Sequence, residues 1–223
     1  MEEKILDYDK DNIIELKNIF FEIAGRRILS NVNLDIKRNN ITLIYGKSGS
    51  GKSTLLNIMN MLYKVKEGTY KFNNILVDLD DENKISEIRK KIGFFHQELA
   101  LMENLTIEEN MKIFSKIIEK PIDRKMLDEY LELLDIKKIY KVNVSTLSGG
   151  ERQRAAFLKL LILPYEVIFI DEPTNNLDTE NIKVIEKGIK KLKEQGKTVV
   201  VVSHFIPLQE IADIVIDLEK INE

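Results

Sequence analysis

The chain has no cysteine and no tryptophan, and its 223 residues include only four prolines and two histidines. The absence of cysteine excludes disulfides and thiolate metal sites, and it fits a reducing compartment. Long apolar runs are missing too: stretches such as Val167–Ile170 and Val199–Val202 are far shorter than the roughly 20 residues of a membrane helix. The amino terminus has no basic stretch before an apolar run, so we expect no secretory signal. If the protein works at a membrane, another chain must span it, with this chain peripheral on the cytoplasmic, inner face.

Neither sign of charge is in large excess. The 37 acidic and 34 basic side chains give a net charge of -3, which argues against a nucleic-acid partner. Apolar residues make up 43% of the chain and charged residues 32%, the balance of an ordinary globular protein. The length suits a single domain over residues 1–223.

A glycine-rich stretch between a predicted strand and a predicted helix carries the first functional motif. Residues 41–45 are apolar and residues 55–62 have helical spacing, which is the context that a phosphate-binding loop requires. Glycines let such a loop curl so that backbone N–H groups and the helix N-terminus face phosphate oxygens. The residues predicted to bind the nucleotide here are Gly46, Lys47, Ser48, Gly49, Ser50, Gly51, Lys52, Ser53 and Thr54.

Two side chains of this loop and two later acidic residues predict the chemistry. Lys52 should reach the β- and γ-phosphates, and the Ser53 hydroxyl should bind Mg²⁺. Asp171 follows a buried apolar run and should also hold Mg²⁺, while Glu172 should face the water that attacks the γ-phosphate. The sequence therefore predicts ATP and Mg²⁺ as cofactors and hydrolysis as the reaction.

Strands and helices alternate in a way that predicts an α/β fold with a mostly parallel sheet. Strands are expected at residues 13–16, 19–23, 32–36, 41–45, 68–72, 75–77, 92–95, 167–170 and 199–202. Besides the helix after the glycine-rich loop, helices are expected at residues 107–119, 124–134, 148–163 and 179–195. The fold class is thus a P-loop NTPase core with an N-terminal antiparallel β part. The α/β core should cover about 13–97 and 164–223, and the strand-free stretch of about 98–163 should be an inserted helical subdomain.

The segment from Leu147 to Glu151, Leu-Ser-Gly-Gly-Glu, resembles the signature motif of the ATP-binding cassette (ABC) proteins, and the resemblance extends from about residue 13 to residue 218. It implies a head-to-tail homodimer formed with ATP, in which the signature of one chain covers the nucleotide of the other. It also implies catalytic roles for Gln97 and His204 beside Lys52 and Glu172, and a metal contact for Gln97. The further nucleotide contacts that it implies are Ser148, Gly149, Gly150, Glu151 and Asp178.

The position of the adenine platform departs from this family. Members usually carry an aromatic residue upstream of the glycine-rich loop, where it stacks on the base. The alignment places Ile23 there, so we expect an aliphatic contact with the adenine. A shift of the strand would bring Phe20 or Phe21 to the position instead.

The stretch Pro173–Asp178 resembles the group of the family that releases lipoproteins and exports macrolides and peptides. This resemblance implies export of a peptide, bacteriocin, antibiotic or lipoprotein-type substrate through a separate integral-membrane permease. One alternative is a cell-division-type ATPase that drives mechanical signalling through a membrane partner. Another is an importer ATPase, which often carries a regulatory extension that we do not expect here. A translation or DNA-repair protein of the family is less expected, because a second cassette and a long coiled-coil insertion are both missing.

The permease should dock where the α/β core meets the helical subdomain. Leu99, Leu101, Met102 and Leu105 lie there, and we expect exposed apolar side chains among them. The alternative is that they pack in the core under the following helix.

Overall fold

The computed structural model describes residues 11–96, 101–175 and 177–222, so that Gln97 and Leu99 lie outside the described residues. The strands are β1 Asn12–Ile23, β2 Arg26–Lys37, β3 Ile41–Tyr45, β4 Glu67–Phe72, β5 Ile75–Leu76, β6 Ile92–Phe95, β7 Val167–Asp171, β8 Thr198–Ser203 and β9 Ile214–Asp217. The helices are α1 Lys52–Met59, α2 Glu82–Arg89, α3 Ile107–Ile117, α4 Arg124–Leu133, α5 Gly149–Ile162, α6 Thr179–Glu194 and α7 Leu218–Ile221.

A parallel sheet in the order β6-β7-β8-β3-β9 forms the centre of the fold. Its strands β7 and β8 are apolar and largely β-branched because both of their faces are buried. Successive side chains alternate between the faces. Val167 and Phe169 therefore enter one apolar core, and Ile168 and Ile170 enter another.

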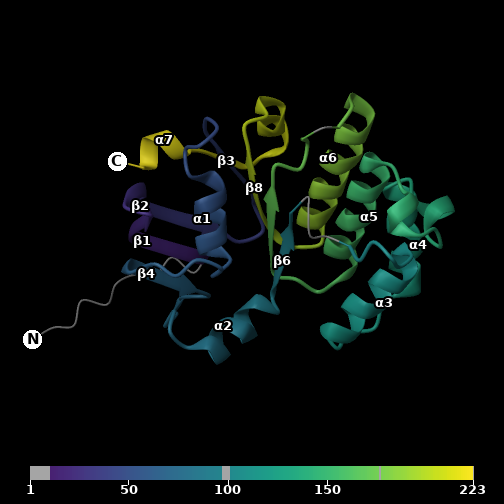
Figure 1. The fold of residues 1–223 in the computed structure, drawn as a ribbon, viewed down its shortest axis with the longest axis horizontal. Coiled ribbons are helices and arrows are strands. Elements are labelled where there is room, and N and C mark those ends of the chain that lie inside the picture. The colour runs from purple at the N-terminus through teal and green to yellow at the C-terminus, as the bar shows by residue number, and fades with distance from the viewer. Residues whose placement is uncertain (1–10, 97–100, 176, 223) are drawn as a thin grey trace, which may run out of the picture.

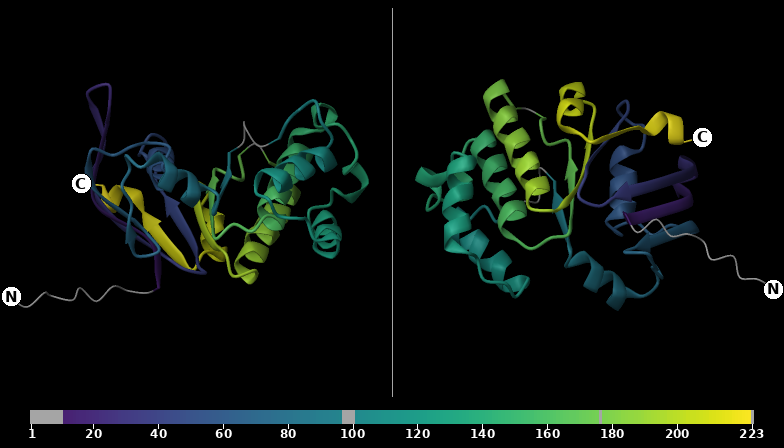
Figure 2. Two further views of the ribbon diagram at one scale, coloured as in Figure 1. Left: turned by 90° about the horizontal axis from the view of Figure 1, so that it is seen from below. Right: turned by 180° about the vertical axis from the view of Figure 1, so that it is seen from behind.

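The two cores lie on opposite sides of this sheet. The first is shared with α1, α2 and a second, antiparallel sheet in the order β2-β1-β4-β5. The second is shared with α3, α4, α5 and α6. Figures 1 and 2 show these four helices on one side of the molecule and the antiparallel sheet on the other. The predicted α/β class, with a parallel sheet and an N-terminal antiparallel part, is confirmed.

The amino-terminal strand differs from the expectation in its continuity. Residues 13–16 and 19–23 were expected as two strands with a turn between them, but β1 runs through both with irregular register near Asn18. Asn18 takes a left-handed φ of 53° and its side chain donates to Asn31 Oδ1 at 3.0 Å. The bulge keeps both strand halves paired, so the polar residues do not end the strand.

The site elements meet at one edge of the parallel sheet. The carboxyl ends of β3, β7 and β8 carry the glycine-rich loop, the Asp171–Glu172 pair and His204, respectively. Adjacent parallel strands place their carboxyl ends together, which brings these distant segments into one site. Within residues 11–96, 101–175 and 177–222, no helix has the length and apolar character needed to cross a membrane.

Candidate functional site

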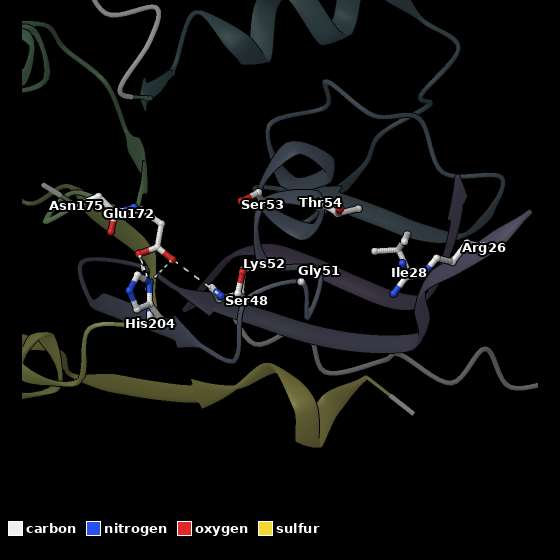
Figure 3. Close-up of a pocket in the computed structure, with 11 residues that line it drawn as sticks. Arg26, Ile28, Ser48, Gly51, Lys52, Ser53, Thr54, Glu172, Asn175 and His204 are labelled. Atoms are coloured by element: carbon white, nitrogen blue, oxygen red, sulfur yellow. Dashed lines mark hydrogen bonds and ion pairs between the residues drawn. The ribbon is translucent and has the colours of Figure 1, made fainter. Parts of the chain in front are cut away.

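A pocket of about 720 Å³ lies over the start of α1 (Figure 3). The loop that forms its floor depends on Gly51, which has a left-handed φ of 97°. A Cβ on Gly51 would also lie 3.0 Å from Leu29 Cδ2 and 3.2 Å from Ile28 Cγ2. Glycine is therefore required here by conformation and by space. The lining residues are Arg26, Ile28, Ser48, Gly49, Gly51, Lys52, Ser53, Thr54, Glu172, Asn175 and His204.

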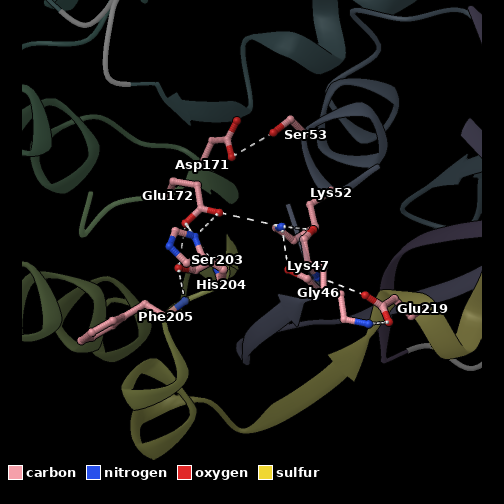
Figure 4. Close-up of polar contacts among 10 residues, drawn as sticks. All are labelled: Gly46, Lys47, Lys52, Ser53, Asp171, Glu172, Ser203, His204, Phe205 and Glu219. Atoms are coloured by element: carbon pink, nitrogen blue, oxygen red, sulfur yellow. Dashed lines mark hydrogen bonds and ion pairs between the residues drawn. The ribbon is translucent and has the colours of Figure 1, made fainter. Parts of the chain in front are cut away.

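Lys52 is buried and tied to its own loop. Its Nζ donates to the carbonyl oxygens of Gly46 at 2.8 Å and Lys47 at 2.9 Å, and it lies 3.9 Å from Glu172 Oε1. The Lys47 backbone N–H donates in turn to Glu219 Oε1 at 3.2 Å (Figure 4). These contacts fix the lysine at the helix N-terminus, where an anion is favoured.

Asp171 and Ser53 form an oxygen-rich pair across the pocket. The Ser53 hydroxyl donates to Asp171 Oδ1 at 3.3 Å. Burial raises the pKa of Asp171, and the Ser53 hydrogen bond opposes that effect. Hard oxygen donors of this kind suit Mg²⁺, which keeps several waters and is completed by substrate phosphates. No cluster of three or more acidic, His or Cys ligands occurs in the parts of the chain that the structure describes.

Glu172 is held in an unusual backbone conformation beside His204. Its φ is 44°, in the left-handed region that costs a non-glycine residue about 1–3 kcal/mol. Its N–H donates to Val202 O at 2.9 Å. The carboxylate accepts from Ser203 Oγ at 2.9 Å, and both of its oxygens lie 3.0 Å from His204 Nδ1 (Figure 4). Held by these contacts, the carboxylate lines the pocket, with Oε1 3.9 Å from Lys52 Nζ.

The residues of the signature motif begin α5, away from this pocket. Ser148 is the N-cap and accepts from the Glu151 N–H, while Glu151 Oε2 accepts from the Ser148 N–H at 2.9 Å. The hydrogen bonds from Ser148 lower the pKa of Glu151. This capping box leaves the helix N-terminus exposed at Ser148 and Gly149. Neither Ser148 nor Gly149 lines the pocket that contains Lys52.

Asn181 connects the signature to Asp178, a link that we did not predict. Asp178 caps α6 and its carboxylate accepts from the Asn181 side chain at 3.0 Å. The Asn181 Oδ1 accepts from Arg154 of α5, and a Cβ on Gly150 would lie 2.9 Å from Asn181 Nδ2. A single asparagine in a polar helix start gives no pattern that would have revealed this contact.

The far end of the pocket differs from the expectation for the base. Ile23 is 46% exposed and is not among the lining residues, whereas Arg26 and Ile28 are. Phe21 stacks on Tyr63 with ring centroids 5.4 Å apart, and Phe20 lies under Arg27. Ile23 stays a prediction as the adenine contact. Arg26 and Ile28 line the pocket without having been expected there from the sequence, and Asn175 and Ser203 had been given no role of their own.

The family profile described as ABC transporter matches residues 29–175, which span the glycine-rich loop, the signature and the Asp171–Glu172 pair. The chain belongs to the ABC transporter family. Among curated proteins of that family, an uncharacterized ATP-binding protein, MJ0796 of Methanocaldococcus jannaschii, is 38% identical over 93% of both chains.

Other relatives in the ABC transporter family are longer than this chain. A putative ABC transporter ATP-binding protein of Mycoplasma pneumoniae is 32% identical over 93% of this chain and 46% of its own length. The macrolide export ATP-binding/permease protein MacB of Campylobacter jejuni is 36% identical over 86% of this chain and 30% of its own. The chain thus spans about half or less of the length of these two relatives.

Solved ABC cassettes have the same architecture. The dimeric structure of MJ0796 matches with a TM-score of 0.79 at 34% identity, covering 92% of this chain and 94% of that one. A post-hydrolysis structure of the same cassette, bound to ADP and Pi, matches equally well. The prediction of an ABC cassette with the P-loop fold is confirmed.

Proposed function

We propose that this ABC-type ATP hydrolase powers a membrane permease that exports a peptide, bacteriocin, antibiotic or lipoprotein-type substrate. The observation that carries the hydrolytic part of the proposal is the position of Lys52 Nζ, 3.9 Å from Glu172 Oε1 at one end of the pocket. A cation that binds the γ-phosphate and a carboxylate that receives a proton from water must act on the same phosphorus, so they must share one end of the site.

The side chains around Glu172 have distinct roles in this mechanism. Glu172 orients the attacking water and accepts its proton. Ser203 and His204 hold the Glu172 carboxylate through contacts of 2.9 Å and 3.0 Å. Lys52 neutralises charge that develops on the phosphate oxygens. His204 is the exposed member of this set, so it is free to contact the γ-phosphate as well.

Ser53 and Asp171 are the residues that would hold Mg²⁺ with the nucleotide, because their oxygens already lie 3.3 Å apart. The bound ion would neutralise the phosphate charge during the reaction. Gln97, which lies outside the described residues, is proposed from the resemblance as a further metal contact.

The N-terminus of α5, at Ser148, is a second position that favours an anion, and it does not line the pocket that contains Lys52 of the same chain. We infer that the signature residues Ser148, Gly149, Gly150 and Glu151, with Asp178, meet the ATP bound to a partner copy in a head-to-tail dimer. The exposed capping box supports this arrangement, since helix N-termini favour anions. The solved dimer of MJ0796 supports it too.

Size-exclusion chromatography of the Glu172→Gln variant tests this dimer. With Mg·ATP the variant should elute as a dimer, because the γ-phosphate joins both chains and is not removed. With Mg·ADP it should elute as a monomer. The matched control is Lys52→Ala, which should stay monomeric in both. Equal elution of Glu172→Gln with ATP and ADP would contradict the dimer.

Export is favoured over import by the stretch Pro173–Asp178 and by the 36% identity with MacB. The glutamine transport protein GlnQ of Bacillus subtilis is 31% identical. The chain would then act at the inner face of the cell membrane. Tagged chain purified from native membranes should retain an integral-membrane permease, and reconstituted inside-out vesicles should accumulate its substrate on addition of ATP. Retention of a division-type membrane protein without transport would instead support mechanical signalling.

A further inference from the structure

The pocket over α1 has a second end that the hydrolytic residues do not use. In Figure 3, Glu172, Asn175 and His204 lie at one side of the loop, and Arg26 and Ile28 lie at the other, beyond Thr54. A nucleotide whose γ-phosphate meets Glu172 must extend away from it along the start of α1. Its base therefore reaches the end of the pocket that Arg26 and Ile28 line.

The hairpin between β1 and β2 explains why these two residues face the pocket. Arg26 and Ile28 are two residues apart on β2, so their side chains project from the same face. Ile28 is half-buried against the first core and close to Gly51, which fixes its position. Ile23 pairs directly with Arg26 across the tight turn, but its shorter side chain does not line the pocket.

Arg26 has a guanidinium that nothing else in the described residues engages. It is exposed, and no hydrogen bond, ion pair or ring contact to it occurs in the described parts of the chain. Its neighbour Arg27 is different, because its guanidinium carbon lies 5.8 Å from the centre of the Phe20 ring. A planar guanidinium at the wall of a pocket can stack on an aromatic ring, and aliphatic methyl groups can pack on the opposite face.

We propose that the Arg26 guanidinium stacks on the purine base of the bound nucleotide, with Ile28 packed on the other face, in place of the family's aromatic platform. The proposal rests on the nucleotide site proposed above. Arg26 would determine base affinity and take no part in hydrolysis. Because stacking involves the face of a base and not its hydrogen-bonding edge, the increase in affinity should be similar for ATP and GTP.

The test is calorimetric binding of Mg·ATP, Mg·GTP and Mg·tripolyphosphate, a probe that has the phosphates without the base. Arg26→Ala should weaken ATP and GTP binding roughly five- to thirtyfold and leave tripolyphosphate binding within about twofold. Arg26→Lys keeps the positive charge but lacks the planar guanidinium, so its nucleotide affinity should be closer to that of Arg26→Ala than to that of the parent. Arg27→Ala is the matched control and should bind all three ligands as the parent does.

Two results would overturn the proposal. Equal loss of ATP and tripolyphosphate binding in Arg26→Ala would make Arg26 a phosphate ligand, and unchanged binding would remove it from the site. If the parent itself bound neither ATP nor tripolyphosphate, the nucleotide function would fail instead, so the two failures are distinguishable. Thermal unfolding of each variant should match that of the parent, because both hairpin positions are exposed.

Discussion

At the residue scale, Glu172 is the position where a single change should separate binding from chemistry. Glu172→Gln keeps the shape of the side chain but removes the carboxylate that accepts the proton from water. Turnover should fall roughly 10²- to 10⁴-fold, while Mg·ATP affinity stays close to that of the parent. Ser203→Ala is a useful comparison, because it removes one hydrogen bond to the carboxylate and leaves the carboxylate itself. Steady-state ATPase rates and binding titrations check both, and a Glu172→Gln rate within a few-fold of the parent would exclude the role.

Single residues were predictable from the sequence where a spacing motif fixes their chemistry. Lys52, Asp171 and Glu172 lie in one such constellation, and the structure brings them to the pocket or its edge. Ser203 and Arg26 enter the site through strand register and hairpin geometry, and neither has a spacing relation to the loop. For this reason the sequence assigned neither side chain a role in the site.

At the scale of elements, two helices begin with the same capping box and offer a matched pair. Thr106 caps α3 with Glu109, and Ser148 caps α5 with Glu151. Thr106→Ala and Ser148→Ala should each lower the free energy of unfolding by about 1 kcal/mol, the usual value of an N-cap. Only Ser148→Ala should also lose ATP-dependent dimerisation in the Glu172→Gln background. If it dimerised as readily as the Thr106→Ala variant, the signature hydroxyl would have a structural role alone.

The other end of α5 is closed by a buried lysine. Lys197 Nζ donates to the carbonyl oxygens of Leu160 at 2.7 Å and Leu163 at 2.9 Å, at the end of the helix, where carbonyl groups lack an intrahelical partner. Burial lowers the pKa of Lys197 from its ordinary 10.5 to about 7. Between these values the unfolded chain binds more protons than the folded chain, so stability rises with pH in that window.

This titration predicts a pH-dependent difference between the parent and Lys197→Met. The free energy of unfolding of the parent should rise relative to that of the variant as the pH increases from about 7 to about 10. Denaturant unfolding of both proteins at several pH values measures it. A difference that is constant across this range would mean that the carbonyl acceptors keep the ammonium protonated in the folded state.

Elements were predictable where their pattern is strong. The run of four valines in β8 and the helix α4 that begins at Arg124 were both expected. Helix α2 was not expected from the sequence, because most of its residues are polar and only Ile85 and Ile88 are buried. Strand β9 was not expected either, because it is a short edge strand whose side chains are not fully buried. Weakly amphipathic pieces of this kind are stabilised mainly by tertiary packing, which a local pattern does not reveal.

At the scale of the whole molecule, the surface expected to dock the permease exposes fewer apolar side chains than the sequence of residues 99–105 suggested. Met102 is 40% exposed, whereas Leu101 is half-buried and packs on the second core. The fully buried Asn110 side chain holds the Met102 backbone through two hydrogen bonds. Its Oδ1 accepts from the Met102 N–H at 2.7 Å, and its Nδ2 donates to the Met102 carbonyl oxygen at 3.1 Å. Glu103 accepts from Arg152 of α5 at 2.9 Å. A partner bound at Met102 would therefore contact a segment that is tied to the signature helix.

Met102→Glu should accordingly spare the basal ATPase rate and abolish association with the permease. Ile117→Glu is the control, because Ile117 is 63% exposed on α3 and lies outside the 101–105 segment. Co-purification from membranes and ATPase assays check the pair. Permease binding by Met102→Glu at the level of the Ile117→Glu control would place the docking surface elsewhere.

The central sheet also acts as a partition in the interior of the molecule. Alternate residues of β8 serve different cores, with Val200 and Val202 on the side of α1 and Val199 and Val201 on the side of α5. Side chains in separate cores share few neighbours, so the free-energy losses of distant substitutions such as Leu56→Ala and Leu160→Ala should add within about 0.5 kcal/mol. Because the two cores are independent, substitutions in the core under α1 and substitutions in the core under α5 can accumulate separately during evolution. The ends of the central strands, which lie between the two cores, would keep the reacting groups at the same positions.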